Sequence, residues 1–92
     1  MRKGYGFVGS NAIKTSTANQ EIIPAAPQGW NRGYHLYKFQ FINYEATNVI
    51  INEQTNLYLK ANQGFETETG DAEIFSFVVV DANIDYQWAG AY

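Results

Sequence analysis

The chain has 92 residues, a formal net charge of −3 and no cysteine; 46% of its residues are hydrophobic, 16% aromatic and only 16% charged. The missing cysteines exclude disulfides, thiolate nucleophiles and cysteine-ligated zinc. The six lysines and arginines are scattered, which argues against a basic face for nucleic acid. We expect one domain over residues 1–92, with either an unusually aromatic core or a surface that another molecule covers.

The first third of the chain carries weak strand patterns and several residues that interrupt strands. Residues 1–10, which include three glycines, are expected to form a flexible or extended N-terminal arm. β-branched residues alternate over 13–17 and predict a short strand. The isoleucines at 22–23 precede Pro24 and Pro27. These prolines predict a loop or an edge strand, because proline cannot donate a hydrogen bond to a ladder.

From residue 34 to residue 92 the chain is a succession of strand patterns separated by turn residues, and no apolar 3.6-residue period is convincing. Apolar residues alternate most clearly over 34–44, where Tyr37, Phe39 and Phe41 share one face. The remaining predicted strands are 49–52 and 57–60, joined as a hairpin by 53–56, then 65–69, 74–80, and a final strand with Ile84, Tyr86 and Trp88 on one face.

These short strands predict an all-β fold with little or no helix, an antiparallel β-sandwich of the jelly-roll kind. The segment 74–80 is apolar on both faces: one face carries Ile74, Val78 and Val80, the other Phe75, Phe77 and Val79. A strand with one buried face needs apolar residues only at alternate positions. We therefore expect the second face to be covered by another sheet, another subunit or a ligand.

Two nucleotide-binding patterns overlap near the N-terminus. Residues 4–9 match the dinucleotide fingerprint G-x-G-x-x-G, but only three residues precede them and no helix is predicted to follow, so we reject that interpretation. Residues 3–8 match the start of the ribonucleoprotein consensus, with Tyr5 and Phe7 as base-stacking aromatics. The strand that should come before this motif is missing, which favours an ordinary edge strand.

Two carboxylate patterns also have simpler interpretations. The segment 81–85 has the D-x-N-x-D spacing of a calcium loop, but Tyr86 and Tyr92 occupy the positions that need Gly and Glu. A turn between strands is the favoured interpretation. Glu66 and Glu68 are ~7 Å apart by strand rise, which matches the carboxylate separation of an inverting glycosidase. Without a nearby His or Arg, a solvated strand face is favoured.

No catalytic, cofactor-binding or metal-ligating residue is predicted, and the protein is not expected to be an enzyme. His35 is the only histidine, so a metal site with several histidines cannot form within one chain, and a structural role is expected for it. The three serines, Ser10, Ser16 and Ser76, lie outside any nucleophile-elbow pattern. The longest apolar run is far too short to span a bilayer, so no membrane partner is expected.

Large apolar and aromatic residues are the candidates for an interface or for ligand contact. The aromatic ones could form a platform on which sugar rings stack, while packing in a core or interface is the favoured alternative. The candidate contact residues are Trp30, Tyr34, Tyr58, Ile74, Val78, Tyr86 and Trp88.

Three segments carry a resemblance to a known group of proteins: LYLKANQGFE over 57–66, IFSFVVV over 74–80 and YQWAGAY over 86–92. They resemble segments of small virion proteins of tailed bacteriophages of Gram-positive hosts. The resemblance implies a protein made in the host cytoplasm and located in the virion, as a capsid decoration, neck or tail component. It transfers no functional residues.

The leading expectation is therefore a non-enzymatic virion structural or accessory protein. It would act by packing against other virion proteins and against itself as a homo-oligomer. One alternative is a carbohydrate-binding module that contacts glycans of the host surface. The other is single-stranded nucleic-acid binding through Tyr5 and Phe7, although the charge balance makes nucleic acid an unfavourable partner.

Overall fold

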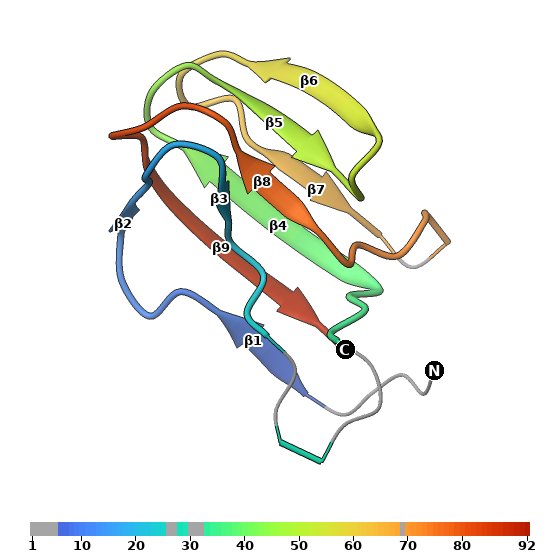
Figure 1. Ribbon diagram of the computed structural model, residues 1–92. Helices are drawn as coiled ribbons and strands as arrows, with labels where there is room; N and C mark the ends of the chain where they lie inside the picture. The colour runs from blue at the N-terminus through green and yellow to red at the C-terminus, as the bar shows by residue number, and fades with distance from the viewer. Residues whose placement is uncertain (1–5, 26–27, 30–32, 69) are drawn as a thin grey trace.

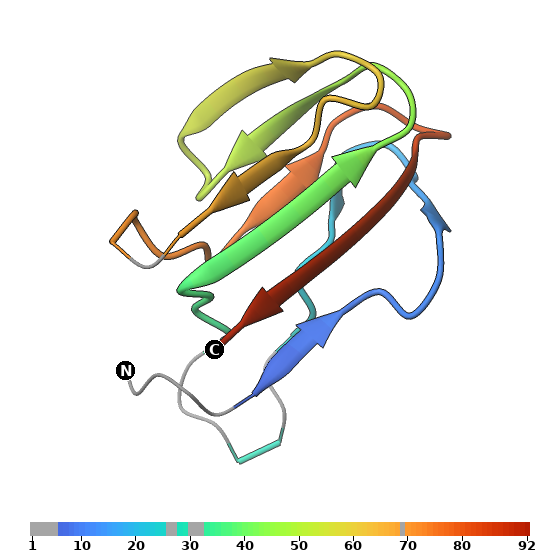
Figure 2. The same ribbon diagram turned by 180° about the vertical axis from the view of Figure 1, so that it is seen from behind.

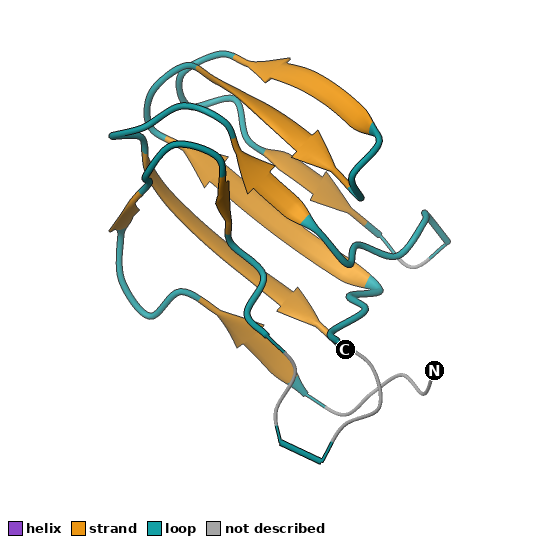
Figure 3. Cartoon of the chain, in the orientation of Figure 1, coloured by secondary structure: helices purple, strands orange, loops and turns teal. Residues whose placement is uncertain are grey.

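The computed structural model describes residues 6–25, 28–29, 33–68 and 70–92, and every regular element in them is a β-strand (Figure 3). The expected all-β class is confirmed. Tyr5, Pro27, Trp30 and Thr69, which took part in predictions above, lie outside the described residues. The strands are β1 (Phe7–Gly9), β2 (Lys14–Thr15), β3 (Gln20–Glu21), β4 (Lys38–Asn43), β5 (Thr47–Ile51), β6 (Thr55–Leu59), β7 (Phe65–Thr67), β8 (Phe77–Val79) and β9 (Asp85–Ala91).

The strands form two antiparallel sheets packed face to face (Figure 1). Sheet A has the order β1-β9-β4-β7, and β2 pairs with β9 as well, beyond the end of β1. Sheet B has the order β3-β8-β5-β6. Figure 2, seen from behind, looks onto the outer face of sheet A, with β9 and β4 running across its centre.

The strand pairing is that of a jelly roll. If β1 and β2 are counted as one interrupted edge strand, the chain forms nested pairs in which first strand meets last: β1 and β2 with β9, β3 with β8, β4 with β7, and β5 with β6. Successive pairs alternate between the two sheets, as two wrapped Greek keys require. The predicted jelly-roll sandwich is thus confirmed.

An aromatic cluster fills the space between the sheets. The ring of Phe77 on β8 lies 4.9 Å from that of Phe39 and 4.7 Å from that of Phe41, measured between centroids. Phe65 on β7 adds a third ring at 5.9 Å. These separations are typical of favourable tilted aromatic pairs. The core therefore joins both sheets through one side chain of β8.

Polar side chains hold the loops at one end of the sandwich. Asn43, which is fully buried, donates from Nδ2 to the carbonyls of Glu45 and Lys60, both at 2.8 Å. Its Oδ1 accepts the N–H of Gly64 at 3.0 Å. Buried polar groups are tolerated when their hydrogen bonds are made, so this asparagine is a structural connector.

Three predicted strands are shorter than their apolar patterns suggested. The pattern over 34–44 yields only β4, because Leu36 turns towards sheet B and exchanges backbone hydrogen bonds of 2.8 and 2.9 Å with Ile74. The pattern over 13–17 yields only β2, because the chain leaves β9 at Ser16, whose buried hydroxyl donates to the Asp81 carbonyl at 2.7 Å. The third is the segment 74–80.

The alternation predicted for 74–80 is wrong at its beginning. Ile74 and Phe77 are both buried, whereas Phe75 is 42% exposed. Asn52 explains the break: its Oδ1 accepts the N–H groups of Phe75 and Ser76 at 2.9 and 3.3 Å and holds the backbone in a bend before β8. Phe75 therefore does not share a face with Phe77.

Part of the segment expected to form an N-terminal arm belongs to sheet A. Phe7, Val8 and Gly9 form the edge strand β1, in register with Ala91, Gly90 and Ala89 of β9. Beyond β1 the hydroxyl of Ser10 accepts the N–H of Trp88 at 3.1 Å and so replaces a backbone acceptor. The glycine-containing start of the chain is thus part of sheet A from residue 7 onwards.

Candidate functional site on the outer face of sheet A

The structure separates the seven contact candidates predicted from the sequence. Ile74, Tyr86 and Trp88 are at most 8% exposed and belong to the core, so their placement at a contact surface is corrected. Tyr34 is half-buried and meets Tyr92 edge-on, with ring centroids 4.9 Å apart.

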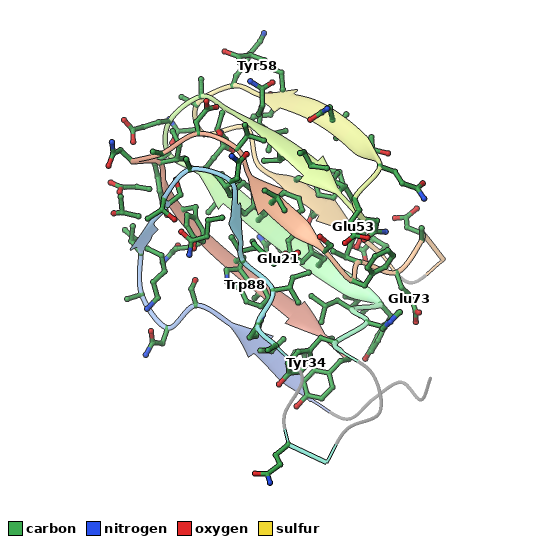
Figure 4. The ribbon with its side chains drawn as sticks, viewed as in Figure 1. Glu21, Tyr34, Glu53, Tyr58, Glu73 and Trp88 are labelled. Carbon is green, nitrogen blue, oxygen red and sulfur yellow. The ribbon has the colours of Figure 1, made fainter. Side chains whose placement is uncertain are left out.

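The remaining candidates do not assemble into one platform. Val78 is half-buried and Tyr58 is 60% exposed, both on sheet B. Figure 4 shows Tyr58 projecting at the β6 end of the molecule and Tyr34 near the opposite end, while Trp30 lies outside the described residues. The predicted sugar-stacking arrangement of these aromatics is therefore not formed.

The predicted second apolar face is present on the outside of sheet B. Val78 of β8 is paired with Ile50 of β5, and both are half-buried, as is Val80 beyond β8. The inner side of the same strands is covered by sheet A. The second sheet therefore covers the inner face of the pattern, and it does not supply the cover that was expected for the second, outer face.

The outer face of sheet A is hollowed. A depression of about 270 Å³ lies over β1, β9, β4 and β7. We call it the sheet A hollow. The residues around it that matter below are Phe7, Lys38, Gln40, Glu66, Glu68 and Ala89.

The register of the strands explains the hollow. One row across the sheet reads Gly9, Ala89, Gln40 and Glu66, each opposite the next. The two residues nearest the edge have almost no side chain. Gly9 is required there, because a Cβ would lie 2.5 Å from the carbonyl oxygen of Trp88. Of these two small residues, Ala89 lines the depression, whereas Gly9 lies beside it on β1. We call this pair, which leaves the backbone bare, the Gly9–Ala89 floor.

The neighbouring row places an exposed aromatic ring beside this floor. It reads Phe7, Ala91 and Lys38 across β1, β9 and β4. Phe7 is 85% exposed, the highest value among the exposed large hydrophobic residues of the described chain. An aromatic ring exposed on a paired strand can serve as the anchor of a contact.

The charged side chains around the hollow form no ion pair with another described residue. Lys38, Glu66 and Glu68 are exposed, and the ion pair found among the described residues is elsewhere, between His35 Nδ1 and Glu73 Oε1 at 3.7 Å. These three charges therefore remain available to another molecule. Their side chains, together with the Gln40 amide, give the hollow a polar rim around an apolar ring.

The carboxylates that suggested calcium are engaged in other contacts. Asp81 Oδ2 accepts from the hydroxyl of Thr47 and the N–H of Asn48, both at 3.0 Å. Asp85 Oδ1 accepts from Thr15 at 2.7 Å on sheet A. Within the described residues no group of three or more His, Cys, Asp or Glu is placed to hold a metal ion. The favoured interpretation of 81–85, a turn between strands, agrees with these contacts.

Sequence reasoning considered Phe7 only as a base-stacking residue and did not consider Gln40 or Ala89 as contact residues at all. The alternation over β4 did place Lys38 and Gln40 on the outer face, as the structure has them. The missing information was the pairing of Gly9 with Ala89, which lie 80 positions apart and give no local signal.

Comparison of the chain with family models, with curated proteins and with solved structures returned no match. No helix long and apolar enough to cross a membrane occurs in the part of the chain that the structure describes. The functional interpretation therefore rests on the outer faces of this sandwich.

Proposed function

We propose that this protein is a non-enzymatic structural or accessory component of a bacteriophage virion, in the capsid decoration, neck or tail, and that it acts by packing against itself and against other virion proteins. The observation that carries the proposal is the outer face of sheet A, where Phe7 is 85% exposed beside charged side chains that form no ion pair among the described residues. The resemblance of residues 57–66, 74–80 and 86–92 to small phage virion proteins supplies the setting.

The architecture is compatible with this role. Jelly rolls serve in viral capsid and lectin domains, among others, although a fold by itself does not assign a function. An aromatic anchor on a rigid strand, surrounded by a polar rim, is the usual composition of a protein contact. Because Phe7 lies on a strand paired with β9, little ordering would be needed when a partner binds.

Purified particles test this proposal. Particles of a phage whose genome encodes this chain should contain it at a fixed copy number by mass spectrometry. Particles that lack it should bind the purified protein saturably in a sedimentation assay. Phe7→Ala should weaken that binding at least about tenfold, while Tyr58→Ala, an exposed aromatic on the other sheet, serves as control. Absence from such particles, together with a protein that remains monomeric, would refute the proposal.

A glycan of the host surface is the second candidate, because the sheet A hollow combines the Phe7 ring with the Gln40 amide and the Glu66 carboxylate. An apolar ring with a few polar groups around it is the composition of many small-ligand sites. Calorimetric titration with host wall polysaccharide decides this. Binding that Phe7→Ala abolishes would support it, and no heat at millimolar sugar would exclude it.

Nucleic acid is disfavoured on the same face. Phe7 is exposed, as base stacking would require. However, Glu66 and Glu68 border the same hollow, and their charges repel phosphate groups.

A further inference from the structure

We infer that two copies of this chain pair face to face through the outer face of sheet A, each copy placing Phe7 over the Gly9–Ala89 floor of the other. The inference rests on the proposed function, since it specifies the surface and the geometry of the self-association. The occupant of the sheet A hollow is thus a second copy of the same chain.

Shape is the first argument. The hollow measures about 270 Å³, and a cavity of about 150 Å³ is enough for a benzene-sized ring. The ring that protrudes and the depression that would receive it lie on the same face of the same chain. A surface that carries both a protrusion and its complement is suited to an isologous contact, in which both subunits use the same patch.

The register fixes how the two copies can meet. Packed sheets keep their strands within about 30° of each other. A twofold axis lying between the faces and across the strands would place the Phe7–Ala91–Lys38 row of one copy over the Gly9–Ala89–Gln40 row of the second. The largest side chain of one row then meets the smallest of the other.

This arrangement also brings the two aromatic rings together. Phe7 and Gly9 are two residues apart on β1, a distance of ~6.8 Å along a strand. A ring placed over the second copy's Gly9 would therefore lie beside that copy's own Phe7. The spacing falls within the range of favourable aromatic pairs, ~4.5–7 Å between centroids.

Charge is the second argument. In the same arrangement Lys38 lies over the second copy's Gln40, next to that copy's Glu66, because Gln40 and Glu66 are paired across β4 and β7. Lys38 forms no ion pair with another described residue of its own chain. Glu68 follows β7 and brings a like charge near the second copy's Glu66, so the contact is attractive at Lys38 and repulsive at Glu68.

The area of the face sets the strength of the dimer. Four strands ~4.8 Å apart and a seven-residue strand rising ~3.4 Å per residue give a face of roughly 19 by 24 Å. Two such faces bury on the order of 900 Å², below the range of stable complexes. We therefore expect a reversible dimer that dissociates in about the micromolar range.

Sedimentation velocity from about 5 to about 500 μM tests the inference. The wild type should shift from monomer to dimer across this range. Phe7→Ala should raise the dissociation constant at least about tenfold, and Ala89→Gln, which fills the floor, should do the same. Glu68→Gln should lower it about two- to threefold because it removes the repulsion. Tyr58→Ala, on the outer face of sheet B, is the matched control and should change nothing.

A mixture of two variants gives a second test, which does not depend on non-specific association. Phe7→Ala keeps the floor and lacks the ring, whereas Ala89→Gln keeps the ring and lacks the floor. Native mass spectrometry of the two variants mixed in equal amounts should show heterodimer well above twice the amount of either homodimer, the ratio that random pairing gives, since only the heterodimer retains one contact between a ring and a floor. Heterodimer at or below twice the amount of each homodimer would contradict the geometry.

The outcomes separate this inference from the proposed function. A wild type that remains monomeric to about 500 μM, or a Tyr58→Ala variant that is impaired as much as Phe7→Ala, overturns the dimer. A dimer that is absent from the phage particles leaves the inference standing and removes the virion role. A chain that is monomeric in solution but present in the particles overturns the dimer and leaves the virion role standing. Circular dichroism of each variant confirms that it is folded.

Discussion

The two outer faces of this sandwich differ in a way that their amino-acid composition does not reveal. The outer face of sheet B carries Ile50, Val78 and Val80, yet these side chains are half-buried by their neighbours in the sheet. The outer face of sheet A carries mainly polar residues, yet it holds Phe7 and the hollow beside it. We therefore place the proposed contact surface where a large side chain lies next to very small ones, and not where apolar residues are most frequent.

The largest expected effect comes from the core that supports both faces. Phe77→Ala should lower the free energy of unfolding by about 3–5 kcal/mol, because it removes a ring packed on Phe39, Phe41 and Phe65. Urea denaturation followed by tryptophan fluorescence measures this. Phe75→Ala, two residues away and 42% exposed, is the control and should cost under about 1 kcal/mol. Equal losses would mean that β8 does not join the two sheets.

A smaller effect should be confined to the face of sheet A. Gly9→Ala places a Cβ 2.5 Å from the Trp88 carbonyl and should cost about 1–3 kcal/mol by forcing β1 away from β9. Hydrogen exchange should increase in β1 and β9 and stay unchanged in β5 and β6. Gly33→Ala is the control, since a Cβ there has no neighbour within 4 Å. Uniform loss of protection in both sheets would show that the two faces are not independent.

A gain of stability is expected at the inner side of β7. The hydroxyl oxygen of Thr67 is buried and has no hydrogen-bond partner among the described residues, so Thr67→Val should raise the free energy of unfolding by about 1 kcal/mol. Thr47→Val is the matched control: its hydroxyl donates to the Asp81 carboxylate, and its loss should cost about 1.5–3 kcal/mol. Thermal melts of both variants provide the measurement, and a destabilised Thr67→Val variant would contradict the expectation.

The smallest effect concerns alkaline pH. Burial raises the pKa of the Tyr86 phenol above its ordinary value, so the unfolded chain loses this proton before the folded chain does. The stabilisation is complete below about pH 10 and declines as the pH rises through the raised pKa. Tyr86→Phe should therefore lose less stability above about pH 10 than the wild type, as measured by urea titrations at stepped pH. Tyr58→Phe controls for removing one phenol, and identical slopes for Tyr86→Phe and wild type would count against the burial effect.

Strand patterns and turn residues were the parts of the fold that could be predicted locally. The alternation of Phe39 and Phe41 with Lys38 and Gln40 appears in β4 as buried and exposed positions. The Asn-Gln-Gly segment 62–64 connects β6 to β7, and Asn62 and Gly64 have positive φ values of 63° and 73°. Side-chain alternation follows from strand geometry, and left-handed φ values favour Asn and Gly, so neither depends on distant residues.

Most of the proposed contact site could not be predicted from local sequence patterns. Tyr86 and Trp88 were predicted to share a strand face and to be contact residues, and only the packing of the two sheets assigns them to the core. Ile74 was misplaced in the same way. An aromatic side chain on a strand has the same sequence signature whether a second sheet or a partner covers it, because alternation identifies a face and not what lies against it.

The sequence by itself determined that this protein is all-β, and the spacing of its strands and turns indicated a jelly-roll sandwich, because those signals repeat along the chain every few residues. Only the tertiary structure decided which faces are covered and where the hollow lies. The reason is the nested pairing of the fold: Gly9 meets Ala89 and Phe7 meets Ala91 because the first strand pairs with the last. Contacts between residues so far apart in the chain are fixed by the assembly of both sheets and leave no trace in any single segment.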